Sequence, residues 1–478
     1  MPDARAKHAY SGTNKGDPRV PFDPIIAEIR FGMGLSPRIA PPVSQDAMLA
    51  RLRGPDDAAA RFVIPLWADT YPSPRDYRDL AQVRRAARGT DREAEVLDQQ
   101  RAMRAAGRDM RGATFAAHLA RAATTSDGMR ERLTRFWADH FTVRAVTGVT
   151  RHLVSPYVEE AIRPHVMGRF SDILRAVTTH PMMLVYLDQH LSMGPNSRTA
   201  LRRNRGLNEN LARELLELHT LGVGASYTQT DVRELAELLT GLSYSPKNGF
   251  AFLRNIAEPG PEVVLGKTYG GDVPRLDDIL TALDDLAMHP DTARHIGRKL
   301  AVHFVADDPP VGLVDDLAAV FAETGGDLDA VVAVLLRHPA AWDVTRAKVK
   351  PPFGFVASAV RALDIDVDAL AAMSFNEGRA AFGRHLAVMG QPWEEPVGPD
   401  GWPEDGPSWI TPQGMAGRIT WSMIIPQRLR DDLPDPRAFV VTALGPEADP
   451  AVVFAAGAAE DRAAGVGLVL ASAAFQRR

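Results

Sequence analysis

"NENLARELLELHTLGVGASYTQTDVRELAELLTGLSY", residues 208–244, decides the fold class, because apolar residues recur every three or four positions on both sides of a glycine-containing turn. This is the period of an amphipathic helix, so the stretch predicts two helices joined near residues 222–224. In the second helix, Thr228 with Asp231 three residues later comes close to a capping box and marks the helix start. The stretch therefore predicts a helical protein.

The first of these helices carries an acid that an amphipathic pattern would not place there. With Glu209 at 0°, Glu214 falls at about 140°, inside the arc of about 120° to 240° that leucines occupy. Glu209, Arg213 and Glu217 follow at four-residue steps, a spacing that predicts mutual ion pairs. Burial of an unpaired carboxylate costs several kcal/mol, so Glu214 is expected to be paired, protonated or bound to a metal.

Two further helices are expected to bury ionisable groups. In "ERLTRFWADHF", residues 131–141, the same projection places His140 within the aromatic arc, so that it points into the core. In "PMMLVYLDQHL", residues 181–191, apolar residues surround the helix and Asp188 is expected to be buried among them. Groups with shifted pKa values gather at active sites, although structural networks contain them too. His140, Asp188 and Glu214 are therefore the candidate catalytic residues.

Composition excludes several classes of protein. The chain has 478 residues, of which 45% are hydrophobic and 24% charged, as in an ordinary globular protein. A net charge of only -5 argues against general nucleic-acid binding, which needs a dense cationic face. The absence of cysteine excludes disulfides, thiolate nucleophiles and Cys-ligated metals. No apolar run resembles a signal peptide or a membrane span, so no membrane association and a cytoplasmic location are expected for the sequence as given.

The pattern along the chain predicts a mainly α protein: a large helical body, a small β-hairpin insertion and a long irregular loop near the C-terminus. Residues 1–20 are expected to form a flexible tail. Residues 21–128 form an N-terminal helical region with a long Arg-rich helix, whose interleaved charges are typical of a solvated face. Residues 129–390 form the helical core, with the β insertion at about 245–272. Residues 391–478 contain the Trp-, Pro- and Gly-rich loop and then the C-terminal helices.

Familiar catalytic and binding motifs do not occur. "GPEVVLGKT" places five residues between Gly260 and Gly266, where a phosphate-binding loop requires four. "DIDVDALAAMSF" has Ala369 where a calcium loop needs Gly and Phe375 where it needs Glu. Neither HExxH nor GxSxG is present, so zinc peptidases and elbow-type serine hydrolases have no local support.

Six segments resemble the bacterial family called domain of unknown function 1800. They are "RFWADHFTV", "MLVYLDQHLSMGPNS", "GLNENLARELLELHTLGVGASYTQTDV", "HPDTARHIGRKLAVHFVADDPP", "KVKPPFGFV" and "MGQPWEEPVGPDGWP". The resemblance implies a large helical protein but no established activity. Many relatives look secreted and are encoded beside another uncharacterised family related to alkaline phosphatases and sulfatases, which suggests a partner or a shared substrate.

At one segment the chain departs from this family. It has Trp137-Ala138-Asp139-His140 where relatives often have Trp-His-Asn-His, so a His-x-His metal pair is lost. A divalent metal would then need His140 together with Asp188, Glu214 or His219.

Two functional hypotheses remain open. The first is a hydrolase-like enzyme in which a buried carboxyl acts as general acid and a second group as base or metal ligand, on a saccharide or a phosphate- or sulfate-bearing substrate. The second is a non-enzymatic helical scaffold or assembly partner of the phosphatase- or sulfatase-like neighbour, in which buried charges serve specific folding.

Two groups of residues are candidates for substrate binding. Trp393, Trp402 and Trp409 could form a stacking platform for a ring, or could simply pin the loop to the body. Four arginines precede a helix N-terminus, where phosphate or sulfate is favoured, although a solvated loop explains them equally: Arg198, Arg202, Arg203 and Arg205.

Overall fold

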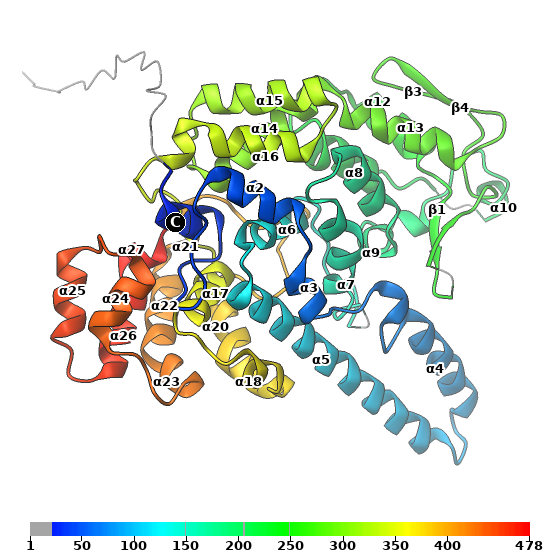
Figure 1. Ribbon diagram of the computed structural model, residues 1–478. Helices are drawn as coiled ribbons and strands as arrows, with labels where there is room; N and C mark the ends of the chain where they lie inside the picture. The colour runs from blue at the N-terminus through cyan, green and yellow to red at the C-terminus, as the bar shows by residue number, and fades with distance from the viewer. Residues whose placement is uncertain (1–21, 149, 204–205, 248) are drawn as a thin grey trace, which may run out of the picture.

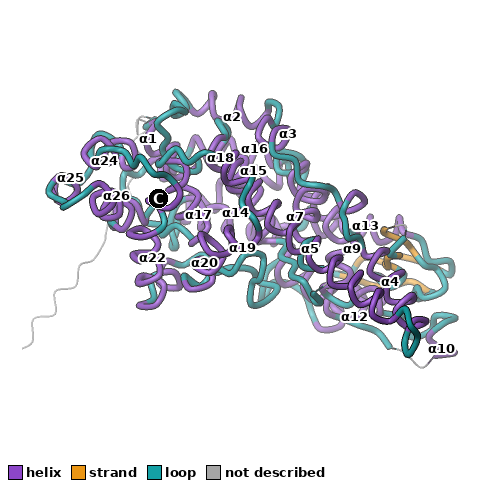
Figure 2. The backbone as a smooth tube through the Cα atoms, turned by 90° about the horizontal axis from the view of Figure 1, so that it is seen from below, coloured by secondary structure: helices purple, strands orange, loops and turns teal. Residues whose placement is uncertain are grey.

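The computed structural model describes residues 22–478 with the exception of 149, 204, 205 and 248. Within this part, helices dominate and the strands form two small antiparallel hairpins, which confirms the predicted mainly α fold (Figure 1). The hairpins lie at one end of the molecule and the C-terminal helices at the other, as both views show (Figures 1 and 2).

The N-terminal region contains short helices and one long helical hairpin. Its α-helices are α1 (Pro24–Ile26), α2 (Gln45–Arg53), α3 (Asp57–Arg61), α4 (Pro74–Ala87) and α5 (Glu93–Thr124). The Arg-rich stretch thus forms two helices, which turn back on each other at Gly89, a residue with φ of +73°. Together α4 and α5 extend away from the body in Figure 1.

The central region surrounds α6, which supplies most of the candidate site. Its α-helices are α6 (Gly128–His140), α7 (Val154–Tyr157), α8 (Phe170–Thr179), α9 (Pro181–Tyr186), α10 (Ala200–Arg203), α11 (Asn210–Glu214), α12 (Gln229–Leu238), α13 (Leu276–Ala287), α14 (Pro290–Phe304), α15 (Val311–Thr324) and α16 (Leu328–Arg337). As predicted, a capping box of Thr228 and Asp231 begins α12.

Two hairpins form the β insertion that the sequence predicts. Strands β1 (Leu242–Ser245) and β2 (Gly249–Phe252) pair with each other, as do β3 (Gly260–Val264) and β4 (Lys267–Gly271). The β3–β4 hairpin packs against α12.

The C-terminal region is again helical. Its α-helices are α17 (Pro352–Ala362), α18 (Val367–Ala371), α19 (Phe375–Gly378), α20 (Arg384–Val388), α21 (Gly406–Trp409), α22 (Pro412–Ile424), α23 (Pro426–Leu429), α24 (Pro436–Leu444), α25 (Pro450–Gly457), α26 (Arg462–Ala471) and α27 (Ala473–Gln476). Between α20 and α22 the chain is irregular apart from the single turn of α21, which agrees with the predicted Trp-rich loop.

Short 3₁₀ and π segments interrupt or extend these helices. The π segments are η1 (Ala27–Phe31), η3 (Val158–Ile162), η6 (Leu215–His219) and η8 (Arg379–Gly383). The 3₁₀ segments are η2 (Trp67–Asp69), η4 (Arg163–His165), η5 (Gln189–Leu191) and η7 (Pro339–Trp342).

Two large clusters of buried apolar side chains form most of the core, and a small third one contains Met193, Ala200 and Ile256. One of the large clusters lies mainly between Ile26 and Trp342, and the other combines the C-terminal part of α5 with residues 353–475. Helix α6 belongs to the first cluster, while α17 and the residues packed against Trp393 belong to the second. The candidate site lies where these two parts meet. No helix of the described chain combines the length and apolarity needed to cross a bilayer.

Candidate functional site

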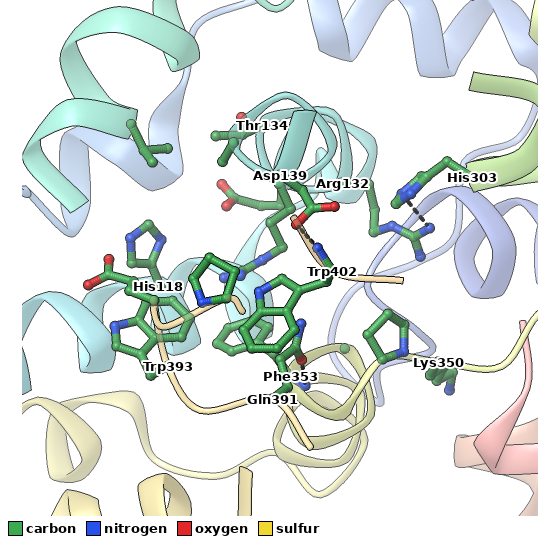
Figure 3. A pocket seen from close by; sticks show the side chains of 18 of the residues that line it. His118, Arg132, Thr134, Asp139, His303, Lys350, Phe353, Gln391, Trp393 and Trp402 are labelled. Atoms are coloured by element: carbon green, nitrogen blue, oxygen red, sulfur yellow. Dashed lines mark hydrogen bonds between the residues drawn. The ribbon is translucent and has the colours of Figure 1, made fainter. Parts of the chain in front are cut away.

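Two cavities lie along α6 and share one wall. The inner cavity, shown in Figure 3, has a volume of about 170 Å³, and the outer one about 530 Å³. Both are lined by Asp139 of α6 and by Trp402, Pro403 and Glu404 of the Trp-rich loop. A helix and a loop far apart in sequence therefore create one composite site.

Asp139 is the central residue of the shared wall. Its Oδ1 accepts a 2.8 Å hydrogen bond from the backbone N–H of Trp402 (Figure 3). Burial raises the pKa of Asp139 to about 7, with further contributions from Glu404 and Asp400, while the Trp402 N–H and Lys299 act in the opposite direction. The carboxyl can therefore carry a proton near neutral pH.

Lys299 of α14 faces the outer cavity without a bonded partner. No hydrogen bond or ion pair within 4.0 Å holds its ammonium group to any described residue, and burial lowers its pKa although Asp139, Glu404 and Asp400 favour the charged form. Asp400 lines the same cavity. The outer cavity thus combines a cation with carboxyl groups.

A chain of hydrogen bonds continues from the wall into the protein. Arg132 donates from Nη2 to His303 Nε2 at 3.1 Å (Figure 3). The ring must therefore carry its proton on Nδ1, which donates to Glu404. Burial lowers the pKa of His303 to about 3, which keeps the ring neutral. Burial alone would raise the pKa of Glu404, but His303, Arg478 and Lys348 hold it below its usual range.

His140 is buried, as the sequence predicts, and lines the outer cavity. Its Nε2 donates to the backbone oxygen of His219 at 3.1 Å, and its Nδ1 has no partner. His219 is also buried with a partnerless Nδ1, and the two ring centroids lie 6.2 Å apart. Burial lowers the pKa of both rings, so both are neutral.

Glu214 and Asp188 have different environments. Glu214 is half-buried at the end of α11, its Oε2 has no partner, and burial, with Glu217 and Asp400, raises its pKa to about 7. The expected burial of Asp188 is wrong: α9 ends at Tyr186, and Asp188 is exposed on the following turn with φ of 55°. The helical phase fails because the helix stops before this residue.

The predicted metal ligands do not converge. Among the described residues, no three ligand atoms from His140, Asp188, Glu214 and His219 lie within 4.8 Å of one another. Of the three candidate catalytic residues, His140 alone lines either cavity.

Of the four predicted arginines, the structure describes the side chains of two. Arg198 and Arg202 are exposed, whereas Arg205 and the side chain of Arg203 lie outside the described residues. The adjoining helix α10 has only four residues.

The three predicted tryptophans serve as both loop anchors and cavity walls. Trp393 lines the inner cavity and packs against Phe115 and Phe353, with ring centroids 5.0 and 5.1 Å away. Trp409 lines the outer cavity and donates its indole N–H to the oxygen of Pro403 at 2.9 Å. Trp402 lines both cavities. The tryptophan side chains therefore line the cavities and also hold the loop in place.

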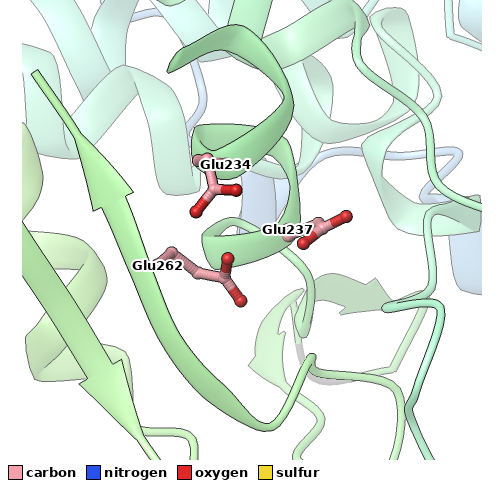
Figure 4. A group of neighbouring side chains, drawn as sticks. All are labelled: Glu234, Glu237 and Glu262. Atoms are coloured by element: carbon pink, nitrogen blue, oxygen red, sulfur yellow. The ribbon is translucent and has the colours of Figure 1, made fainter. Parts of the chain in front are cut away.

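A separate acidic cluster lies between α12 and β3. Ligand atoms of Glu234, Glu237 and Glu262 fall within 4.8 Å of one another, and the three carboxyl groups face a common space in Figure 4. Burial raises the pKa of Glu262 to about 8, and repulsion by Glu237 and Glu234 and a hydrogen bond with Glu234 act in the same direction.

Four residues of the site are not predicted by the sequence pattern, namely Asp139, Lys299, Arg132 and Arg135. With Glu131 at 0°, Arg135, Asp139 and Arg132 fall at about 40°, 80° and 100°, the side of α6 opposite its apolar arc. Such a side normally faces solvent, but here the Trp-rich loop covers it. The family resemblance at both "RFWADHFTV" and "MGQPWEEPVGPDGWP" was the available signal that these segments belong to one site.

Comparison with known protein families identifies the family to which the chain belongs. A family model described as protein of unknown function, DUF1800, matches residues 28–477. The chain belongs to this family, as the sequence segments predict. No curated protein and no solved structure gives a significant match.

Proposed function

We propose that the protein is a hydrolase-like enzyme that cleaves a saccharide or a phosphate- or sulfate-bearing substrate at the wall between the two cavities. The observation that carries this proposal is Asp139, a carboxyl with a pKa of about 7 that borders both cavities. A general acid works best when its pKa lies near the operating pH. Asp139 therefore takes the general-acid role that the sequence predicts for a buried carboxyl.

The proposed reaction is general acid–base hydrolysis. Asp139 donates its proton to the leaving-group oxygen, while the Asp400 carboxylate accepts a proton from the attacking water. The water oxygen forms a bond to the carbon, phosphorus or sulfur atom as the bond to the leaving oxygen breaks. Lys299, which has no bonded partner among the described residues, stabilises the negative charge that develops. Proton exchange with solvent then restores both carboxyl groups.

Asp139→Asn tests this proposal. The amide oxygen can still accept the Trp402 N–H, but the side chain can no longer donate a proton as an acid. We expect kcat on a panel of phosphate esters, sulfate esters and glycosides to fall by roughly 100-fold or more. In the wild type, kcat should decrease as the pH rises above about 7, because the acid is then deprotonated. Asp91→Asn, at an exposed position, is the control.

Absence of turnover on the whole panel, or an unchanged rate for Asp139→Asn, contradicts the proposal. His140→Ala and Glu214→Gln test the residues that the sequence singles out. Lost activity with an unchanged circular dichroism spectrum supports a place for them in the centre, whereas a change in melting temperature alone assigns them a structural role.

A second candidate function is a scaffold or assembly partner of a phosphatase- or sulfatase-like protein. Exposed apolar side chains on neighbouring helices α24, α25 and α26 favour it, namely Val441, Val453, Phe454 and Leu468. Co-purification with the product of an adjacent phosphatase-like gene, lost on Phe454→Ser, would support this function. Retained co-purification of the variant would place the contact elsewhere.

A further inference from the structure

The inner cavity contains cationic side chains that lack anionic partners. Arg135 makes no hydrogen bond with any described residue, and its Nε and Nη2 are buried without a partner. The one hydrogen bond found for the Arg132 side chain within the described chain goes to the neutral ring of His303. The Lys350 side chain, also buried, makes no hydrogen bond or ion pair with the described residues. Buried unpaired cations are unfavourable, so this arrangement requires an explanation.

The carboxyl groups around the cavity are engaged elsewhere. Glu131 pairs with Arg163, and Glu394 accepts a hydrogen bond from Ser155. Glu404 is bonded to His303 and also pairs with Lys348 and Arg478. None of these carboxyl groups forms an ion pair with Arg132, Arg135 or Lys350.

Aromatic rings offset part of the cost of burying these cations. The guanidinium carbon of Arg135 lies 3.4 Å from the ring centroid of Phe353, that of Arg132 5.5 Å from Phe304, and Lys350 Nζ 4.1 Å from Phe475. A ring face attracts a cation, but it cannot accept the in-plane hydrogen bonds of a guanidinium group. The unpartnered N–H groups of Arg135 therefore still need acceptors.

We propose that the inner cavity binds a phosphate or sulfate group, carried by a substrate whose remaining part occupies the outer cavity. Guanidinium groups match such oxyanions through paired hydrogen bonds. A cavity of 170 Å³ holds about five or six waters at roughly 30 Å³ each, which is room for an anion of five non-hydrogen atoms.

Other features of the cavity agree with this ligand. Gln391 Oε1 accepts the backbone N–H of Phe353 (Figure 3), and the amide NH₂ of Gln391 has no acceptor among the described residues, so it remains available to the anion. Asp139 and Trp402 line both cavities, so an ester bond that joins a group in the inner cavity to a remainder in the outer cavity would lie beside Asp139. The substrate assignment rests on the proposed hydrolytic function, whereas oxyanion binding itself does not.

Calorimetric titration with inorganic sulfate and phosphate, in sodium chloride at matched ionic strength, tests binding without turnover. We expect saturable binding that weakens at least about tenfold in Arg135→Met, because this side chain supplies the unpartnered donors. Arg298→Gln, which changes an exposed arginine of α14, should bind like the wild type. Absence of saturable binding, or equal affinity in Arg135→Met, would overturn the proposal.

If Arg135→Met binds no anion, thermal unfolding shows whether the variant has lost an anion site or has lost a side chain that the fold requires. Without anion, Arg135→Met should melt at a higher temperature than the wild type, because it removes an unpaired buried charge. Sulfate should raise the melting temperature of the wild type and leave that of the variant unchanged. A variant that unfolds more easily in the absence of anion, and that still responds to sulfate, would show that Arg135 is structural.

Two further measurements distinguish binding of a free anion from binding of an ester, and anion binding from hydrolysis. Phenyl phosphate and a sulfated monosaccharide should bind more tightly than the free ions, and Trp402→Ala should remove this difference. Binding of free ions alone would overturn the substrate assignment. Asp139→Asn should retain anion binding, so unchanged turnover in that variant would contradict the hydrolytic mechanism while leaving the anion site supported.

Discussion

At the scale of single residues, the docking of the Trp-rich loop depends on a glycine beside Asp139. Gly401 has φ of +79°, and a Cβ there would lie 2.6 Å from the backbone oxygen of Asp139 and 2.7 Å from its Oδ1. These separations are far below van der Waals contact. Only a residue without a side chain allows the loop to come close enough for Trp402 N–H to reach the carboxylate.

Gly401→Ala is therefore expected to displace the loop and weaken the Asp139–Trp402 contact. Gly89→Ala is a matched control, because Gly89 has φ of +73° and a Cβ there would meet no described atom within 4 Å. The control should cost about 1 kcal/mol, and Gly401→Ala clearly more. Melting temperature and tryptophan fluorescence measure the two effects. Equal losses would show that backbone strain alone matters at position 401.

Local sequence predicts some site residues and cannot predict others. The burial of His140 follows from helical phase, and so do the ion pairs of Arg213 with Glu209 and Glu217, each at 3.3 Å. Asp139 could not be assigned in this way, because its partner Trp402 is 263 positions away. Helical phase gives the direction of a side chain relative to its own helix, but tertiary packing decides what covers that side.

At the scale of elements, the β3–β4 hairpin rests on α12 through three acids. Glu262 of β3 is buried against Glu234 and Glu237 of α12 (Figure 4). Burial raises the pKa of Glu262 to about 8, with added repulsion from Glu237 and Glu234. The folded state therefore keeps a proton on Glu262 that the unfolded chain releases near pH 4.5. As the pH rises from about 4.5 to about 8, the contribution of Glu262 to the free energy of unfolding decreases, and the folded state becomes less stable.

Glu262→Gln should remove this pH dependence. Relative to the wild type, we expect the variant to gain of order 2 kcal/mol in the free energy of unfolding between about pH 5 and about pH 9. Melting temperatures across this range provide the measurement, with Glu323→Gln, at an exposed position, as the control. If wild type and Glu262→Gln show parallel curves, Glu262 does not hold a proton in the folded state.

Sequence predicts element type more reliably than element continuity. The helix, hairpin and loop regions were all expected, yet the helix containing Glu214 passes into the π segment η6 after five residues. A π segment has a longer repeat than an α-helix, so angles projected at about 100° per residue drift from the true ones beyond Glu214. For Asp188 the reason is different: α9 ends at Tyr186, so the helical projection does not apply to Asp188, which is exposed.

At the scale of the whole molecule, a buried arginine connects the two parts of the core. Arg361 of α17 pairs with Glu28 of η1 at 2.7 Å and donates to the backbone oxygens of Gly34 and Thr125. The residues around Glu28 belong to the first apolar cluster and those around Arg361 to the second. The site between α6 and the Trp-rich loop depends on the same relative placement of the two parts. Sequence indicated neither contact, because segments more than 200 positions apart meet there.

Arg361→Met tests this connection. The change leaves Glu28 as an uncompensated buried charge and several carbonyl oxygens without donors, so it should cost about 3 to 5 kcal/mol. Arg53→Met removes the exposed Arg53–Asp329 pair, whose N–O distance is 2.6 Å, and should destabilise the protein far less than Arg361→Met, because solvent screens an exposed pair. Hydrogen exchange should be faster in η1, at the end of α5 and in the Trp-rich loop of Arg361→Met, because the two parts separate more readily. Exchange that accelerates only around α17 would show that the two parts are held together by apolar packing rather than by this ion pair.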